Sequence, residues 1–234
     1  IGADGDEMIR RMADRLVAVD LLGPAETLLK YQVDKRLDGI AQAQVATKLA
    51  MIDLMDHKAK DALAAIRTTR IAGLPDDIGH ARLLLEARAL AALKQWDDAT
   101  SLIAVDEAPD TRRLRADIYW ESGNWAVAAQ KTEELLGDIW KAPQPLTAEQ
   151  RQYVMRAAIA YSLATDETSL DRLRDHFAAK MAAGSDASAF AVVTQRIDMQ
   201  GVAFRDAAGK VASVDTLESF MTDFKTRFDK ATTN

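Results

Sequence analysis

The side chains of this sequence that carry acid–base or metal-binding chemistry are few and widely spaced. Asp53 and His57 lie four residues apart, the spacing that places two side chains on one face of a helix, where they would form an acid–base couple or half of a metal site. A solvated ion pair near a helix end explains the same spacing, and we favour it. Asp76, Asp77 and His80 follow a proline, where carboxylates complement the dipole of a first helical turn, so capping explains them better than catalysis.

Other catalytic patterns are missing from the sequence. Adjacent or helix-spaced carboxylates occur without a neighbour that would tune their pKa, as helix surfaces commonly show. These pairs are Asp97 with Asp98, Glu133 with Glu134, and Asp171 with Asp175. There is no glycine-rich phosphate loop, no His-Glu-x-x-His pattern and no cysteine. The sequence therefore predicts a protein that is not an enzyme and that uses no cofactor and no metal.

Arginines form the one cationic feature that suggests a ligand. Guanidinium groups bind carboxylates and phosphates. The arginines concerned are Arg112, Arg113, Arg115, Arg67, Arg70 and Arg88. The chain as a whole has a net charge of −6 and lacks the Lys/Arg-rich runs on which nucleic-acid binding depends. We therefore expect no nucleic acid, and we keep an acidic peptide as a candidate ligand.

Composition is that of a globular protein. Of 234 residues, 48% are hydrophobic and 28% are charged, and the longest apolar runs are far shorter than the ~18 residues of a membrane span. We expect no membrane span. The chain begins with Ile1 and shows no targeting segment, and a chain without cysteine suits a reducing cytoplasm or an oxidising periplasm equally, so its location stays unknown.

The elements that must position these side chains are helices. Glycine and proline are sparse, at 11 and 5 residues, and helix-forming residues dominate. Apolar residues recur at helical spacing, as in Ile9, Met12, Leu16 and Val19. Turn signals separate the helical segments, so we predict an all-α fold.

A pair of small residues twelve positions apart recurs along the chain. A turn signal separates the two members each time: Gly23-Pro24, Asp56-His57, Lys94-Gln95, Gly123-Asn124 and Asp166-Glu167. The pairs are Ala13 with Ala25, Ala50 with Ala62, Ala87 with Ala99, Ala116 with Ala128, and, more weakly, Ala158 with Leu170. Small residues let two antiparallel helices approach closely, so each unit is predicted to be a helical hairpin.

Two of these units carry more of a known signature. The patterns Ala87…Leu90…Trp96…Ala99 and Ala116…Tyr119…Gly123…Trp125…Ala128 resemble the tetratricopeptide repeat. The spacing of the units straddles the family period of about 34 without holding it, and the first-helix tryptophan of the family is absent. The whole chain also resembles the C-terminal part of uncharacterised tetratricopeptide proteins of alphaproteobacteria, a likeness that supplies no function.

This resemblance implies an αα-superhelix, a tetratricopeptide-like solenoid of about five degenerate hairpins, with an unrelated αα-solenoid as the alternative. It also implies that the first helix of each hairpin lines a concave surface for a peptide or partner protein. The positions it turns inward are Arg10, Asp14, Thr47, Met51, Arg88, Arg113, Asp117, Trp120 and Met155. Leu54, Leu84 and Ile159 fall on the same side, and Leu84 and Ile159 above all are explained equally well as core residues.

The C-terminal part departs from the repeats. We expect repeats over residues 1–195, then an irregular connection and a C-terminal capping helix over 196–234, all in one continuous domain. Leu217, Phe220, Phe224 and Phe228 give that helix a broad apolar face, which would cover the open end of the stack. Docking of another chain, including self-association through these four residues, is the alternative.

Taken together, the sequence predicts a non-enzymatic interaction module or scaffold whose partner is a protein or peptide. Two other functions remain open. In one, the chain is the helical-repeat arm of a larger enzyme. In the other, it is an oligomerisation arm that uses its C-terminal helix.

Overall fold

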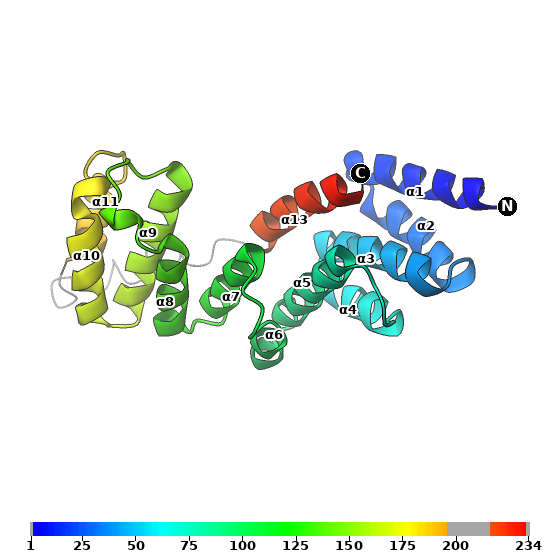
Figure 1. The fold of residues 1–234 in the computed structure, drawn as a ribbon, viewed down its shortest axis with the longest axis horizontal. Coiled ribbons are helices and arrows are strands. Elements are labelled where there is room, and N and C mark those ends of the chain that lie inside the picture. Colours follow the sequence, from blue (N-terminus) through cyan, green and yellow to red (C-terminus); the bar gives the residue numbers. More distant parts are fainter. Residues whose placement is uncertain (1, 196–215, 233–234) are drawn as a thin grey trace. The chain divides into compact units, whose positions relative to one another are not determined.

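The computed structural model describes residues 2–195 and 216–232, and every regular element in these ranges is helical, which confirms the all-α prediction (Figure 1). The α-helices are α1 (Ala3–Ala18), α2 (Leu22–Lys35), α3 (Gly39–Met55), α4 (Ala59–Thr68), α5 (Asp76–Ala92), α6 (Trp96–Leu102), α7 (Pro109–Glu121), α8 (Trp125–Leu136), α9 (Ala148–Leu163), α10 (Glu167–Met181), α11 (Ala187–Val193) and α13 (Thr216–Thr232). A short 3-10 helix, η1, spans Ile139–Lys141. The irregular connection expected after residue 195 lies outside the described residues.

The helices form two compact units. The first contains residues 1–104 together with 217–234, and the second contains residues 105–216. In the first unit, α1 packs on α2, α3 on α4, and α5 on α6; in the second, α7 packs on α8 and α9 on α10. Each helix therefore pairs with the next along the chain, as the hairpin prediction requires.

The recurring small residues lie in the buried interior of these units. Every member of the five pairs identified in the sequence is buried, with at most 2% of its surface exposed. An alanine at such a position keeps the side chain out of the space between two helices, so the backbones approach closely. The twelve-residue spacing thus follows from the packing of each helix on the next one along the chain.

All five pairs also share one turn geometry. Seven residues after the first small residue of each pair, the backbone takes a positive φ, between 56° and 74°. These residues are Asp20, His57, Lys94, Gly123 and Thr165. The next N–H then bonds back to a carbonyl five residues earlier, as from Gln95 to Leu90 at 2.9 Å and from Asp166 to Tyr161 at 3.0 Å. This is the Schellman arrangement that ends a helix on a left-handed residue.

Only Gly123 among the five is a glycine, the residue for which a positive φ costs least. In the first pair the turn lies at Asp20, and Gly23-Pro24, the signal we identified in the sequence, lies instead within the first turn of α2. Proline suits that place because the first N–H groups of a helix have no intrahelical partner.

The expected start of α9 is also present. Thr147 Oγ1 accepts the N–H of Gln150 at 3.2 Å, and the Gln150 side-chain oxygen accepts the N–H of Thr147 at 2.9 Å. This capping box fixes where the helix begins. Asp76 and Asp77 likewise lie in the first turn of α5, as expected of dipole-stabilising carboxylates.

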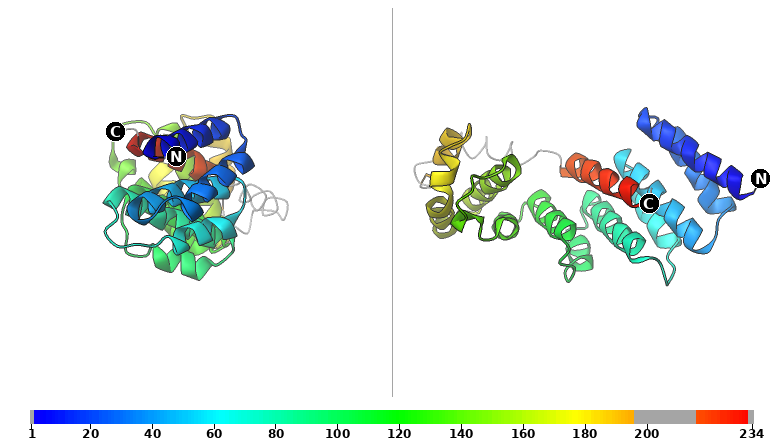
Figure 2. Two further views of the ribbon diagram at one scale, coloured as in Figure 1. Left: turned by 90° about the vertical axis from the view of Figure 1, so that its right-hand side faces the viewer. Right: turned by 45° about the horizontal axis from the view of Figure 1, so that its top comes forward.

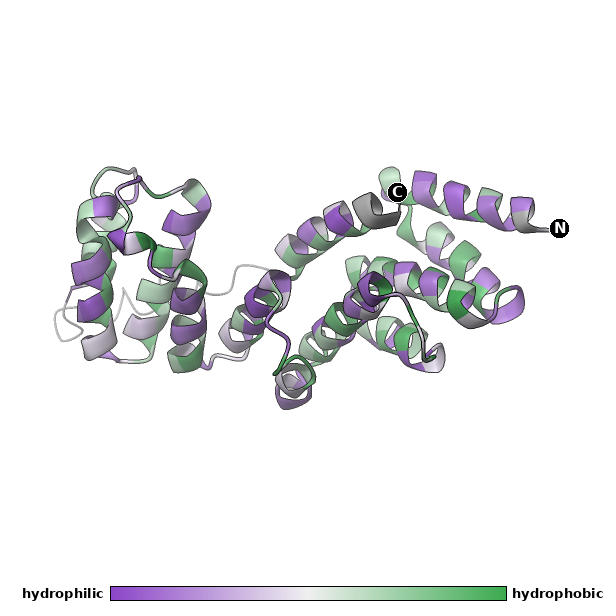
Figure 3. Cartoon of the chain, in the orientation of Figure 1, coloured by the Kyte–Doolittle hydropathy of each residue, from purple (hydrophilic) through white to green (hydrophobic). Residues whose placement is uncertain are grey.

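The core of the first unit is centred on α3 and α5. Residues Leu49 to Leu54 and Leu84 to Ala91 are buried without interruption, so each of these helices is covered on every side over that length. Figure 3 shows the contrast with α1, which is mainly hydrophilic.

A buried arginine joins three helices of this core. Arg82 on α5 is 6% exposed. Its guanidinium donates to the carbonyls of Ala43 (2.8 Å), Ile66 (2.6 Å) and Thr69 (3.1 Å). Two of these acceptors lie at the C-terminal end of α4, where the helix dipole favours a cation. Burial lowers the pKa of Arg82 from its usual value.

The second unit has a core of its own, built mainly from α8, α9 and α10. Its buried side chains include Phe177, Leu173, Leu170 and Val154, together with Trp120 of α7. This core holds α7 and α9 in one body, so side chains on their outer faces have fixed positions relative to one another.

The C-terminal helix is grouped with the N-terminal repeats. From Leu217 on, α13 belongs to the first unit, whereas α9 to α11, which precede it in the chain, belong to the second. That it caps the open end of the stack stays a prediction. Its apolar residues are nevertheless buried, at 9% exposure for Leu217, 7% for Phe220, 4% for Phe224 and 7% for Phe228. Self-association through these four residues would therefore require α13 to leave its unit.

Candidate functional site

The nine predicted binding residues are divided between the two units. Arg10, Asp14, Thr47, Met51 and Arg88 lie in the first, and Arg113, Asp117, Trp120 and Met155 lie in the second. The set must therefore be judged unit by unit.

Three of the residues in the first unit lie in its interior. Thr47, Met51 and Arg88 are 0%, 1% and 3% exposed. The Thr47 hydroxyl donates to the carbonyl of Ala43 at 2.7 Å, inside its own helix. None of the three side chains is exposed to solvent.

The other two, on α1, are held in ion pairs. Arg10 binds Glu7 one turn earlier, with 2.7 Å between Nη2 and Oε2. Asp14 pairs with Lys48 of α3, a partner that the sequence did not reveal because it lies in another hairpin. Both side chains are therefore already engaged in ion pairs within the first unit.

The second unit brings its candidates together. Arg113 of α7 reaches Glu149 of α9, with 3.1 Å between Nη2 and Oε1. One helical turn further along α7, Asp117 Oδ1 accepts from Nη1 of Arg156 of α9 at 2.5 Å. The same guanidinium lies 4.6 Å from the centre of the Trp120 ring. We call Arg113, Asp117, Trp120, Glu149 and Arg156 the α7–α9 strip.

The edges of this strip are aromatic and apolar. Tyr153, between Glu149 and Arg156, donates its hydroxyl to Glu149 Oε1 at 3.2 Å, and burial raises its pKa to about 12, against the lowering effect of Arg113. Trp120 packs edge to face with Trp125, with 5.4 Å between the ring centres. Met155 packs beside the same core and is partly buried.

The exposure of the side chains in the α7–α9 strip changes along its length. The side chains of Arg113 and Glu149 are 44% and 57% exposed, whereas those of Arg156 and Asp117 are 21% and 19% exposed. Nε and Nη2 of Arg156 are buried and have no hydrogen-bond acceptor. Buried N–H groups without acceptors are unfavourable, and a carboxylate that reached this edge of the guanidinium would accept one N–H from each of the two nitrogens.

Sequence reasoning missed Glu149, Tyr153 and Arg156. Their spacing of i, i+4 and i+7 repeats that of Arg113, Asp117 and Trp120 on α7 and was visible in the sequence. The signal that would have found them is the opposite order of charge on the two helices. On α7 the positive Arg113 precedes the negative Asp117, and on α9 the negative Glu149 precedes the positive Arg156.

The structure changes the interpretation of Asp53 and His57, the acid–base pair considered in the sequence. Asp53 is 4% exposed, so the solvated ion pair with His57 that we favoured is wrong for this carboxyl group. Burial raises the pKa of Asp53 to about 7, and the charges of Glu26 and Asp61 add to that effect. His57 lies in the turn that follows, at a φ of 57°.

Two kinds of feature are absent from residues 2–195 and 216–232. No helix in these ranges is long and apolar enough to cross a membrane. No three side chains of histidine, cysteine, aspartate or glutamate there are grouped so that they could hold a metal ion.

Comparison with known proteins identified no relative. The chain matches no protein-family model, no curated protein and no solved structure. Its function must therefore be argued from its own geometry.

Proposed function

We propose that this protein is a non-enzymatic interaction module that presents a helical-repeat surface to a peptide or partner protein. The repeated hairpins support this proposal, because five units with the same turn, four of them with the same buried alanine pair, are what a tetratricopeptide-like solenoid would contain. Solenoids of this kind act through extended surfaces rather than through enclosed catalytic sites.

The observation that carries the proposal is the α7–α9 strip. It combines guanidinium groups, carboxylates and aromatic rings on two helices that a common core fixes in place. Arginine, tryptophan and tyrosine are the residue types that dominate binding energy at protein interfaces. A peptide segment with an acidic side chain would meet Arg113 at the exposed end, whereas Trp120, which is 5% exposed, acts by stacking on Arg156.

Capture experiments with single charge reversals test this proposal. Wild-type protein and the variant Arg113→Glu serve as bait in a lysate of the source organism, with bound proteins quantified by mass spectrometry. The matched control is Lys141→Glu, because Lys141 is 56% exposed in the same unit but pairs with Asp138 away from the strip. Arg88, whose reversal we would have chosen from sequence, is 3% exposed, so reversing it would perturb folding.

We expect a specific partner that wild type and the Lys141→Glu control retain and that Arg113→Glu loses, with at least tenfold lower recovery. Circular dichroism confirms that each variant is folded. A partner retained equally by all three baits would show that the strip is not the binding surface.

A further inference from the structure

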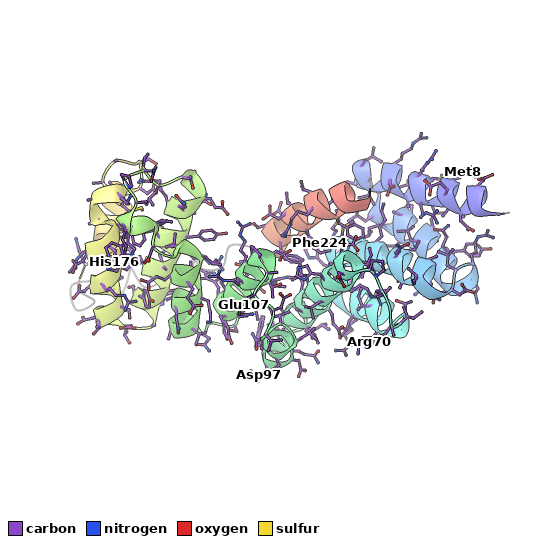
Figure 4. The ribbon with its side chains drawn as sticks, in the orientation of Figure 1. Met8, Arg70, Asp97, Glu107, His176 and Phe224 are labelled. Atoms are coloured by element: carbon purple, nitrogen blue, oxygen red, sulfur yellow. The ribbon has the colours of Figure 1, made fainter. Side chains whose placement is uncertain are left out.

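One face of α1 is left uncovered by the other described helices. Met8, Met12 and Val19 are 68%, 55% and 65% exposed. Figure 2 draws α1 at the edge of the first unit, beside α2, and Figure 4 shows Met8 at the outer edge of this helix. Together with the exposed Asp4 and Arg15, these residues follow one another at intervals of three or four, so they share one side of the helix. We call these five residues the outer face of α1.

The later hairpins bury the positions that correspond to this face. Met8, Met12 and Arg15 stand five before, one before and two after the first small residue of their hairpin. The same positions in α3, α5 and α7 are at most 8% exposed, and they hold Val45, Leu49, Ile52, Arg82, Glu86, Ala89, Thr111, Arg115 and Ile118. The preceding hairpin contributes to that burial, since Glu86 of α5 pairs with Arg67 of α4 at 2.8 Å. In α1, therefore, apolar side chains are exposed where this fold otherwise buries them.

The outer face of α1 lacks one feature that stacking of a further hairpin would use. Gln42 of α3 donates to a carbonyl of α2 at 2.9 Å, and Arg82 of α5 donates to a carbonyl of α4 at 2.6 Å. The corresponding positions of α1 are Gly5 and Met8, and neither residue has a side-chain donor. The face therefore fits an apolar helix better than the end of another repeat.

The charges of the outer face are complementary to those of an antiparallel copy of itself. Asp4 lies near its N-terminal end and Arg15 near its C-terminal end, and neither forms an ion pair with another described residue. An antiparallel second helix places Arg15 of each copy beside Asp4 of the other. The midpoint between Met8 and Met12 lies within about one residue of the midpoint between Asp4 and Arg15, so one alignment joins both kinds of pair.

We propose that the outer face of α1 is a dimer interface, on which α1 of a second copy packs antiparallel. Met8 of each copy lies opposite Met12 of the other, and an Asp4–Arg15 pair closes each end. An isologous contact of this kind closes on itself, so it produces a dimer and no larger assembly. Because α1 is only about 24 Å long, the interface is small, and we expect a dissociation constant on the order of 10–100 µM. This inference does not depend on the proposed function, and the dimer would carry two α7–α9 strips.

Sedimentation equilibrium of the full chain, from about 1 µM to about 1 mM, tests for the dimer. Low ionic strength is used because salt screens exposed charges. Met8→Lys places a charge at the apolar centre of the interface, and we expect dimerisation to weaken by at least about 30-fold. Val105→Lys is the control, because Val105 is 93% exposed and lies in the other unit, and it should dimerise as wild type does. Circular dichroism confirms that each variant is folded.

Two charge reversals test the antiparallel alignment. Asp4→Arg leaves arginine at both ends of the face, and Arg15→Asp leaves aspartate at both ends, so each variant alone should dimerise about tenfold more weakly than wild type. In an equimolar mixture of the two, opposite charges meet at both ends, and the wild-type affinity should return. The control is Asp175→Arg, an exposed site on α10 with the same change of charge, which should leave dimerisation unchanged.

A chain that stays monomeric up to about 1 mM would overturn the inference, because something other than a second copy would then cover the face. A dimer that Met8→Lys leaves intact would overturn it as well, since that dimer would use another surface. So would a mixture of the two charge variants that associates no better than either alone. Arg113→Glu should dimerise as wild type does, so failure of this inference and failure of the α7–α9 strip as a binding surface are measured separately.

Discussion

The guanidinium of Arg156 lies 4.6 Å from the centre of the Trp120 ring while its Nη1 donates to Asp117 at 2.5 Å, so one side chain of α9 is fixed by two side chains of α7. A planar cation held by a carboxylate at its end and an aromatic ring at its face has little freedom to rotate. This relationship makes the α7–α9 strip a preformed surface.

Replacing Arg156 by lysine tests that geometry. Arg156→Lys keeps the charge but loses the planar stacking on Trp120, so we expect about 1 kcal/mol lower free energy of unfolding in urea. Arg11→Lys is the control, because Arg11 is 73% exposed and pairs only with Glu7 on its own helix. A variant as stable as wild type would show that stacking contributes nothing measurable.

The pKa of Asp53 predicts a pH dependence of stability. A folded-state pKa of about 7 exceeds the ordinary value of 3.8, so the native protein holds a proton that the unfolded chain has lost. Stability contributed by this group is therefore fully present below about pH 4 and falls until about pH 7. The three-unit difference corresponds to about 4 kcal/mol, as an upper figure.

The variant Asp53→Asn isolates this effect because it cannot ionise. Its free energy of unfolding should match that of wild type near pH 4 and exceed it by a few kcal/mol at pH 8, with the difference developing between those values. Glu26, Asp61, Lys58 and Lys30 face the same carboxyl group and stay unchanged. A difference that does not vary with pH would contradict the assignment.

We expect substitution of Arg82 to lower the free energy of unfolding more than substitution of any other arginine. Arg82→Met leaves the carbonyls of Ala43, Ile66 and Thr69 without their donor in a buried site, so we expect a loss of about 3 kcal/mol in the free energy of unfolding. Arg11→Met, at the surface, should change it by less than about 0.5 kcal/mol. Equal effects would mean that the buried hydrogen bonds make no net contribution.

The repeated turns predict stabilising substitutions. Thr165 has a φ of 56° and Lys94 a φ of 61°, and glycine takes this conformation without the cost borne by other residues. Thr165→Gly and Lys94→Gly should each raise the free energy of unfolding by about 1 kcal/mol, and Gly123→Ala should lower it by about the same amount.

The control for these turns is Asp175→Gly, an exposed site within α10, where glycine should destabilise by roughly 0.5 kcal/mol. Thermal unfolding gives all four values. Destabilisation by Thr165→Gly and Lys94→Gly alike would show that their left-handed conformations carry no cost.

The helices, the hairpins and the buried small pairs could be predicted from local features of the chain. Ala87 with Ala99 and Ala116 with Ala128 were identifiable because a helical hairpin is formed by residues near one another in sequence, so its crossing point recurs at a constant spacing. The Thr147–Gln150 capping box was identifiable for the same reason.

Exposure was harder to foresee than helix position. Met51 and Arg88 had been assigned to an open surface from their place in the repeat, and Asp53 to solvent from its distance to His57, yet all three are buried. Burial depends on which other helices pack around a residue, and helical periodicity gives only the direction in which the residue points.

The sequence by itself determined that this protein is a series of helical hairpins, because helix propensity, turns and close crossings act over a few residues. Only the tertiary structure decided that Arg156 completes the strip with Trp120 and Asp117, and that the aromatic face of α13 packs with residues 1–104. Those contacts join segments far apart in the chain, and an apolar helical face is compatible with many partners until folding selects one.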